Sequence, residues 1–407
     1  MKVVHVITRL ILGGAQENTI LTCEGLTERG HEVTLITGPT EGPEGDLLER
    51  ARNGGYELIE IPELVRPIRP WTDLQAYRHL RRLLGELDPD IVHTHSAKGG
   101  VLGRYAAWSL RKEVAKACCS KLEKVEQAKV VLRGRPGVVH TIHGLSFHPF
   151  QSVRLNRLYV AAEKRAAVRC DVLISVAAAM TEQSLAAGVG QESQYVKIFS
   201  GMEVEQYLST PSPEQIADTR AQLGIPDEAV VIAKVARLFE LKGHEYVIEA
   251  ARRLQDKYPQ VVWLFIGDGS WRERIEKQIA EAGLSDQFVL TGLVRPERIG
   301  PLLQASDALV HCSLREGLAR ALPQALLCGK PAVSFDVDGA REIVRNGETG
   351  YLVEARDVDG LTGALEKVIG DPEGQRRMGL AGRELCRETF DHRMMVEQIE
   401  RVYEALV

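Results

Sequence analysis

The chain has 407 residues, which is too long for a single hydrophobic core, so we expect two domains of about 200 residues each. Hydrophobic residues make up 44% of the sequence, and the formal net charge is −5. This balance is typical of a globular protein, and it excludes a nucleic-acid-binding surface that extends over the whole chain.

Seven cysteines are scattered along the sequence, and no two of them form a C-x-x-C pair. Scattered cysteines of this kind favour reduced thiols in the cytoplasm. The chain opens with MKVVHVIT, which is typical of a strand rather than of a signal peptide. The sequence contains no run of 18 apolar residues, so we expect a cytoplasmic protein without a membrane span.

The first half of the chain alternates strand and helix patterns. Residues 2–8 form an apolar run, the glycine turn at Gly13 and Gly14 follows, and a helix pattern then extends to Arg29. The alternation continues with strands at residues 31–37, 56–61, 90–93, 137–141 and 172–176, and with helices at residues 74–87, from 98 onward, 153–169 and 177–187. This alternation predicts a doubly wound parallel sheet that binds ligands at the carboxyl ends of its strands.

The second half repeats this architecture. Strands are expected at residues 230–235, 261–266, 288–291, 308–311 and 332–335, with helices between them. Residues 199–213 contain glycine and two prolines and have little periodicity, so we expect the linker there. We therefore place domain boundaries at 1–200 and 201–390, and we expect a C-terminal helix at 391–407 to pack back across the first domain.

Residues 101–135 interrupt the alternation. They contain nine basic residues and three acids, and a thin apolar stripe includes Cys118, Leu122, Val125 and Leu132. A basic amphipathic helix can lie on an anionic membrane surface, which would make the protein peripheral to the inner face of a membrane. The alternative is a solvated helix inserted before the next strand.

Residues 314–332 read LREGLARALPQALLCGKPA. Glu316 and Gly317 open a predicted short helix, and apolar residues recur at helical spacing until Gly329 ends it. Free N–H groups at Glu316 to Ala319 would bind phosphate or hydroxyl groups. The alternative is an ordinary surface helix with a favourable acid at its start.

Polar or glycine residues follow several of the other predicted strands. Arg237 and Lys242 come after residues 230–235 and could form a diphosphate site or be surface charges. Gly267 and Gly292 follow two further strands and are candidates for donor binding, although a tight turn alone would also favour glycine there. Asp336 and Asp338 could be a carboxylate metal clamp or could cap a helix.

Two histidine pairs also follow strands, at His93-x-His95 and at His140-x-x-His143. We expect the first histidine of each pair to point inward from the strand and the second to lie in the loop. His143 is the better ligand-binding candidate, and the alternative is a structural histidine that holds the loop in place. We expect no metal, since a catalytic zinc site also needs a carboxylate or a third histidine in fixed geometry.

The order of the motifs GGAQ, VHTHSAKGGVLGR, HTIHG, SGMEVEQY, VARLFELKG, GDG and REGLARALPQALLCGKPAVSFDVDGAREIV, followed by GYLV, resembles the retaining glycosyltransferases of family four. The resemblance covers nearly the whole chain. It implies the GT-B fold, with two Rossmann-like domains facing a cleft, the acceptor on the N-terminal domain and the nucleotide sugar on the C-terminal domain. The implied partners are a nucleotide-sugar donor and a glycan or lipid-linked acceptor, with no separate cofactor and no nucleic acid.

The resemblance also assigns roles to residues. Arg237 and Lys242 match the pair that neutralises the donor diphosphate, and Glu316 matches the first acid of the E-x7-E motif, which addresses the donor sugar. The remaining matches are the donor-binding turn at Gly317, Leu318 and Ala319, the glycine loop at Gly13 and Gly14, and His143, which faces the donor sugar.

One residue departs from the family pattern. The family has a second glutamate eight residues after Glu316, where it holds the ribose hydroxyls, and this chain has Gln324. The resemblance places Gln324 at the ribose and implies retention by front-face substitution without a metal. The alternative is a GT-B protein that binds a nucleotide sugar and has lost catalysis.

Overall fold

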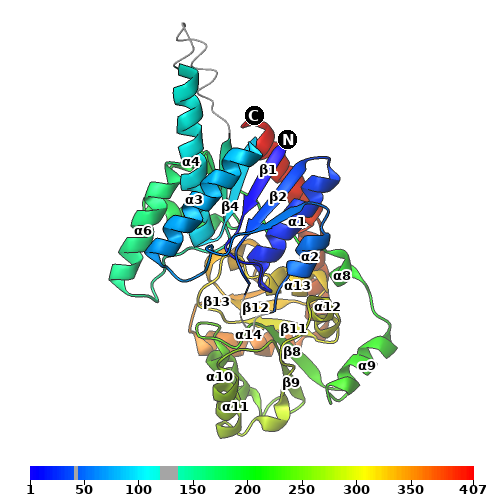
Figure 1. Ribbon diagram of the computed structural model, residues 1–407. Coiled ribbons are helices and arrows are strands. Elements are labelled where there is room, and N and C mark those ends of the chain that lie inside the picture. The colour runs from blue at the N-terminus through cyan, green and yellow to red at the C-terminus, as the bar shows by residue number, and fades with distance from the viewer. Residues whose placement is uncertain (41–44, 120–135) are drawn as a thin grey trace. The chain divides into compact units, whose positions relative to one another are not determined.

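The computed structural model describes residues 1–40, 45–119 and 136–407, and it divides into two compact units. Unit 1 comprises Met1–Met202 and His392–Val407, and unit 2 comprises Glu203–Asp391. Each unit is built on its own parallel sheet with helices packed against it (Figure 1). The predicted α/β class, with two doubly wound parallel sheets, is therefore confirmed.

The described part of unit 1 contains a seven-stranded sheet in the order β3-β2-β1-β4-β5-β6-β7. The strands are β1 (Lys2–Val6), β2 (Glu32–Thr37), β3 (Glu57–Glu60), β4 (Ile91–His95), β5 (Gly137–Ile142), β6 (Val172–Ser175) and β7 (Tyr195–Lys197). Every residue of β4 and β5 is buried, as expected for central strands covered on both faces. The order in which the chain adds strands to the sheet reverses between the neighbouring strands β1 and β4.

Helices cover both faces of this sheet. They are α1 (Gly14–Glu28), α2 (Leu48–Asn53), α3 (Pro70–Leu87), α4 (Ala97–Cys119), α6 (Val153–Ala167), α7 (Ala178–Ala186) and the C-terminal α16 (His392–Glu404). On one face α16 packs against α1, and its buried side chains Met395, Val396, Ile399 and Tyr403 complete a core with residues of β1 and β4. On the other face α3 and α4 pack over a second core.

Unit 2 has a six-stranded sheet among its described residues, in the order β10-β9-β8-β11-β12-β13. The strands are β8 (Val230–Val235), β9 (Val261–Ile266), β10 (Phe288–Leu290), β11 (Ala308–His311), β12 (Ala332–Phe335) and β13 (Gly350–Val353). The helices are α8 (Glu205–Leu208), α9 (Pro213–Gln222), α10 (His244–Leu254), α11 (Arg272–Glu281), α12 (Pro296–Gln304), α13 (Ala321–Leu327), α14 (Val358–Gly370) and α15 (Pro372–Thr389). The order in which the chain adds strands to this sheet reverses between β8 and β11, and we call this place the reversal point of the sheet.

Two features differ from the sequence predictions. The edge strands β7 and β13 were not predicted, because each is only three or four residues long and at most partly buried, without a long apolar run. The predicted linker at 199–213 contains α8, whose Tyr207 is buried in unit 2. Among the described residues, no helix is both long enough and apolar enough to cross a membrane.

The basic segment at 101–135 is described only in part. Residues 120–135, and with them most of the proposed apolar stripe, lie outside the described residues. Two of the described basic side chains are used inside unit 1: Arg104 is buried and donates to Glu163 at 2.8 Å, and Arg111 donates to Asp171 at 2.8 Å. These two cations stabilise the fold of unit 1 and do not form part of an exposed basic face.

Candidate active site

The carboxyl ends of β8 and β11 form the reversal point of the unit 2 sheet, which is where open α/β sheets bind ligands. The loop after β8 carries Arg237 and Lys242 and leads into α10, while the loop after β11 carries Glu316 and leads into α13. Fold topology therefore brings together two segments that are about 75 residues apart in sequence.

Lys242 and Glu316 form an ion pair across this point, with 2.5 Å between Nζ and Oε1. Burial is the largest single influence on the pKa of Glu316 and raises it, but the charges and hydrogen bonds of neighbouring groups, Lys242 first among them, together lower it more, and the resulting pKa is about 2. His311 lies 3.7 Å from the same oxygen, and burial lowers its pKa to about 3. His311 is therefore neutral near pH 7, and Lys242 is the cationic partner of the carboxylate.

The loop that carries Glu316 is held by residues after β12. The Glu316 N–H donates to Asp338 Oδ2 at 2.7 Å, and the Gly339 N–H donates to the Gly317 carbonyl at 3.2 Å. Asp336 instead pairs with Arg341 at 2.9 Å. The two acids thus have different partners, and this arrangement supports neither a shared metal clamp nor a helix cap: Asp338 fixes the Glu316 loop.

The predicted start of the next helix was wrong. The helix α13 begins at Ala321, and Glu316 to Ala319 precede it as a loop. Pro323 explains the difference, because a proline ring clashes with the carbonyl four residues earlier and so must lie in the first helical turn. The alternative of a surface helix is also wrong, since every residue of α13 is buried and Leu318 and Ala319 are buried before it.

Two residues that sequence analysis missed hold the loop after β8. Lys234 is buried within β8 and its Nζ donates to the Lys242 carbonyl at 2.9 Å, while burial lowers its pKa. His244 Nε2 donates to the Arg237 carbonyl at 3.1 Å. A lysine inside the apolar run VVIAKV was the available signal, because a lysine at such a position needs a specific partner.

Glycines allow the loops of unit 2 to pack closely. Gly243 has φ +65°, and a Cβ there would lie 1.9 Å from the Cys312 carbonyl oxygen. Gly267 has φ +139°, and a Cβ would lie 2.2 Å from the Ala236 carbonyl oxygen. Packing therefore requires glycine at Gly267 whatever its part in donor binding, and the donor-binding roles of Gly267 and Gly292 stay predictions.

Gln324 lies on α13 and is buried. Its Nε2 donates to the Tyr207 hydroxyl on α8 at 2.8 Å. The amide is therefore tied to a neighbouring helix of unit 2, and its predicted contact with a ribose stays a prediction.

In unit 1, the corresponding reversal point lies between β1 and β4. Gly13 precedes α1 in an extended conformation, with φ −178°, and Gly14 is the first residue of that helix. Ser96 follows β4 with φ +61°, and its Oγ lies 2.7 Å from Thr8 Oγ1 in the loop after β1. The two loops are thus hydrogen-bonded to each other at the end of the sheet.

The histidine pairs are placed differently from each other. His143 lies just after β5, as predicted, and lines a pocket with Ser96, His140 and Ser146. The prediction that His95 lies in a loop was wrong, because His95 is the last residue of β4 and is fully buried. The Nδ1 of His95 lies 3.1 Å from His143 Nε2, so His95 and His143 are hydrogen-bonded to each other.

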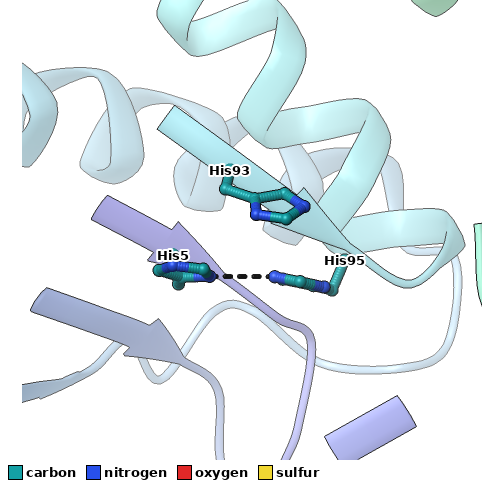
Figure 2. Close-up of side chains that lie close together, drawn as sticks. All are labelled: His5, His93 and His95. Atoms are coloured by element: carbon teal, nitrogen blue, oxygen red, sulfur yellow. Dashed lines mark hydrogen bonds between the residues drawn. The ribbon is translucent and has the colours of Figure 1, made fainter. Parts of the chain in front are cut away.

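Sequence analysis missed a cluster of three buried histidines, His5, His93 and His95, whose nitrogens lie within 4.8 Å of one another (Figure 2). Three imidazoles are a plausible ligand set for zinc. However, His5 Nδ1 and His95 Nε2 face each other at 3.0 Å, and both ring nitrogens of His93 contact hydroxyl groups at 2.6–2.7 Å. This arrangement fits a hydrogen-bonded network, and a metal ion would have to displace these contacts.

The chain has two Rossmann-like units, and one of them carries a cation–carboxylate pair at the reversal point of its sheet. GT-B glycosyltransferases have this architecture. The family "Glycosyl transferase 4-like domain" matches residues 13–196, and "Glycosyl transferases group 1" matches residues 215–385. The chain belongs to the group 1 glycosyltransferases, which use nucleotide sugars as donors.

Similar proteins span almost the same length. The chain is 27% identical to the putative glycosyltransferase EpsD of Bacillus subtilis, over 86% of this chain and 85% of that protein. It is also 27% identical to an Escherichia coli α-1,3-galactosyltransferase that is named for UDP-Gal and a GlcNAc-diphosphoundecaprenol acceptor, over 91% and 88%. The structure of Anabaena HepE with UDP and glucose aligns over all of both chains, with a TM-score of 0.80 and 21% identity.

Proposed function

We propose that this protein transfers a hexosyl residue from a nucleotide sugar to a glycan or lipid-linked acceptor, with retention of anomeric configuration. The observation that carries the proposal is the Lys242–Glu316 pair at the reversal point of the unit 2 sheet, beside the loop that carries Arg237. The cations at this reversal point can neutralise a diphosphate, and the ionised acid can accept hydrogen bonds from sugar hydroxyls.

The cations stabilise the leaving group. A nucleoside diphosphate leaves only if its developing negative charge is neutralised, and preorganised cations do this without reorganisation during the reaction. Lys242 has three N–H donors, so it can bond both Glu316 and a phosphate oxygen at once. Its backbone is held by buried Lys234, which limits the movement of the loop when the donor binds.

Glu316 orients the donor sugar. With a pKa of about 2 the carboxylate is ionised throughout the physiological range, and an ionised carboxylate accepts hydrogen bonds from sugar hydroxyls. Glu316 stays paired with Lys242, so we assign it to binding rather than to nucleophilic attack. Retention would then follow from attack on the same face that the diphosphate leaves, with the leaving phosphate helping to accept the acceptor's proton.

Unit 1 would supply the acceptor-binding residues. We assign the loop at Gly13 and Gly14 to the donor diphosphate as well as to the acceptor, and we assign His143 at the end of β5 to the donor sugar. The similar proteins support an acceptor of this class, because the E. coli relative is named for a diphosphoundecaprenol acceptor and a Mycolicibacterium smegmatis relative for a phosphatidylinositol monomannoside. A lipid-linked acceptor would bring the enzyme to a membrane surface.

A thermal-shift panel of UDP, GDP and ADP, each with and without its common sugars, tests the donor site. A ligand at 100 times its dissociation constant adds about 2.7 kcal/mol to stability. We expect one nucleotide class to raise the melting temperature, and we expect the matching nucleotide sugar to release free nucleotide when an acceptor is present. Stabilisation without any sugar release would favour the alternative of a catalytically inactive binding protein.

Replacing Gln324 with glutamate tests the ribose contact. The Tyr207 hydroxyl can donate to the new carboxylate, and a carboxylate accepts a ribose hydroxyl more strongly than an amide does. We expect the nucleoside diphosphate to bind about five- to tenfold more tightly, measured by calorimetry. Tyr207→Phe is the matched control, since it removes the hydroxyl and leaves Gln324 in place. Unchanged affinity in Gln324→Glu would show that residue 324 does not reach the ribose.

A further inference from the structure

Six polar groups in unit 1 form a continuous chain of close contacts that ends at His143. In order they are Thr141, His93, Tyr403, His5, His95 and His143, and we call them the imidazole chain. The successive distances are 2.7, 2.6, 3.4, 3.0 and 3.1 Å, and each histidine between the ends uses both ring nitrogens.

The fold places these groups on one face of the sheet. His5 in β1 pairs in register with His93 in β4, and His95 pairs with Thr141 in β5. Side chains two residues apart on a strand share a face, so all four point the same way. The C-terminal helix α16 covers this face and contributes Tyr403, which is fully buried. Figure 2 shows the contact between His5 and His95 beside His93.

The buried members of the chain are neutral. Burial lowers the pKa of His5 to about 3 and the pKa values of His93 and His95 well below their usual range. Burial also raises the pKa of Tyr403, which therefore keeps its proton. A neutral imidazole has one N–H donor and one lone pair. A chain of such groups can only donate in one direction throughout, so fixing one proton fixes all of them.

The Tyr403 hydroxyl indicates the direction. Its oxygen lies 2.6 Å from His93 Nδ1 and 3.4 Å from His5 Nε2. Hydrogen bonds donated by a hydroxyl are shorter than those donated by a ring N–H. The hydroxyl proton therefore belongs in the short contact, where it is donated to His93. His5 Nε2–H then donates to Tyr403, and His5 Nδ1 accepts from His95 Nε2–H.

We propose that the imidazole chain holds His143 with its proton on Nε2, donated to His95 Nδ1, so that Nδ1 of His143 offers a lone pair. His143 lines the pocket beyond β5, so the tautomer decides whether its Nδ1 accepts or donates a hydrogen bond. Tyr403 is thus a positioning residue for His143. The tautomer rests on the geometry and on the neutrality of the buried imidazoles, while its effect on sugar transfer rests on the function proposed above.

Selective ¹⁵N labelling of histidine tests the tautomer directly. Long-range ¹H–¹⁵N spectra at pH 8 distinguish the two neutral forms, and the His143 signals are assigned by their loss in His143→Ala. We expect His143 to carry its proton on Nε2 in the unmodified protein. We expect Tyr403→Phe to give a mixture of both forms, because phenylalanine can neither donate to His93 nor accept from His5.

Tyr56→Phe is the matched control. Tyr56 is also a buried tyrosine of unit 1, and its hydroxyl has no hydrogen-bond partner among the described residues. The tautomer of His143 should be unchanged in this variant. An Nδ1–H form of His143 in the unmodified protein would overturn the proposal, and so would a tautomer that stays the same in Tyr403→Phe.

Kinetics separate this proposal from the proposed function. With an active donor, Tyr403→Phe should lower kcat about tenfold while the donor KM changes by less than about twofold, and Tyr56→Phe should leave both unchanged. If no nucleotide sugar is turned over by the unmodified protein, the proposed function fails, and the tautomer measurement still decides the inference. If transfer occurs and Tyr403→Phe leaves kcat unchanged, the positioning role is overturned.

Discussion

Glu316→Gln is expected to lower the rate of sugar transfer by about 10²–10³-fold, the range observed when one preorganised electrostatic contact to a transition state is removed. The glutamine keeps the shape of the side chain and can still accept from Lys242, but it cannot carry the charge that orients the sugar and balances the ammonium. The Glu316 N–H bond to Asp338 involves the backbone, so the loop should stay in place. Steady-state release of nucleotide from the donor measures the effect.

Glu348→Gln is the matched control for this variant. Glu348 forms an exposed pair with Arg345 at 2.9 Å, and such pairs contribute about 0–1 kcal/mol. This control should keep full activity, and both variants should keep an unmodified circular dichroism spectrum. Full activity in Glu316→Gln would remove Glu316 from the mechanism and, with it, the observation on which the proposed function rests.

Much of the fold was predictable because parallel α/β structure has a strong local signal. The apolar runs at 2–8, 137–141 and 261–266 are buried on both faces and so are continuous in the sequence. The short edge strands β7 and β13 lack this signal, since no residue of β7 and only half of those of β13 are buried. The start of α13 was misplaced because Glu316 and Gly317 resemble a helix start locally, whereas Pro323 sets the real boundary.

The candidate site was likewise predictable from the sequence only in part. Arg237, Lys242 and Glu316 were identified because they belong to motifs at strand ends. The partners of the supporting residues Asp338 and Lys234 could not be predicted, because these contacts exist only once the strands are ordered in the sheet. His5 is the clearest case: it lies in the first strand, and it meets His95 only because β1 and β4 are neighbours and the two side chains share a face.

Acidification below pH 6.5 is expected to destabilise unit 1 more steeply than unit 2. Burial lowers the pKa values of four histidines in unit 1 and two in unit 2: His5, His93, His95 and His140, and His244 and His311. An unfolded histidine binds a proton below about pH 6.5, but these folded histidines do not. Stability is therefore complete above pH 6.5 and is lost as the pH falls toward the folded pKa values.

The size of the effect follows from proton linkage. Once the unfolded form is fully protonated, each such histidine lowers the free energy of unfolding by about 1.4 kcal/mol per pH unit. Four of them therefore lower it by about 4 kcal/mol between pH 6.5 and 5.5, and by about 9 kcal/mol between pH 6.5 and 4.5. A domain has about 5–15 kcal/mol of stability in total. Unit 1 should therefore unfold near pH 5, and unit 2, with half as many such groups, should persist to lower pH.

Urea unfolding followed by hydrogen exchange and mass spectrometry measures each unit separately. Between pH 5.5 and 4.5 the free energy of unfolding of unit 1 should change with a slope that corresponds to about four bound protons, against about two for unit 2. His140→Asn should reduce the slope of unit 1 by about one proton, because it removes one titrating group whatever it does to stability. A slope below one proton for unit 1 would mean that these imidazoles are charged in the folded state. The imidazole chain would then lose the neutrality that lets it fix one tautomer of His143.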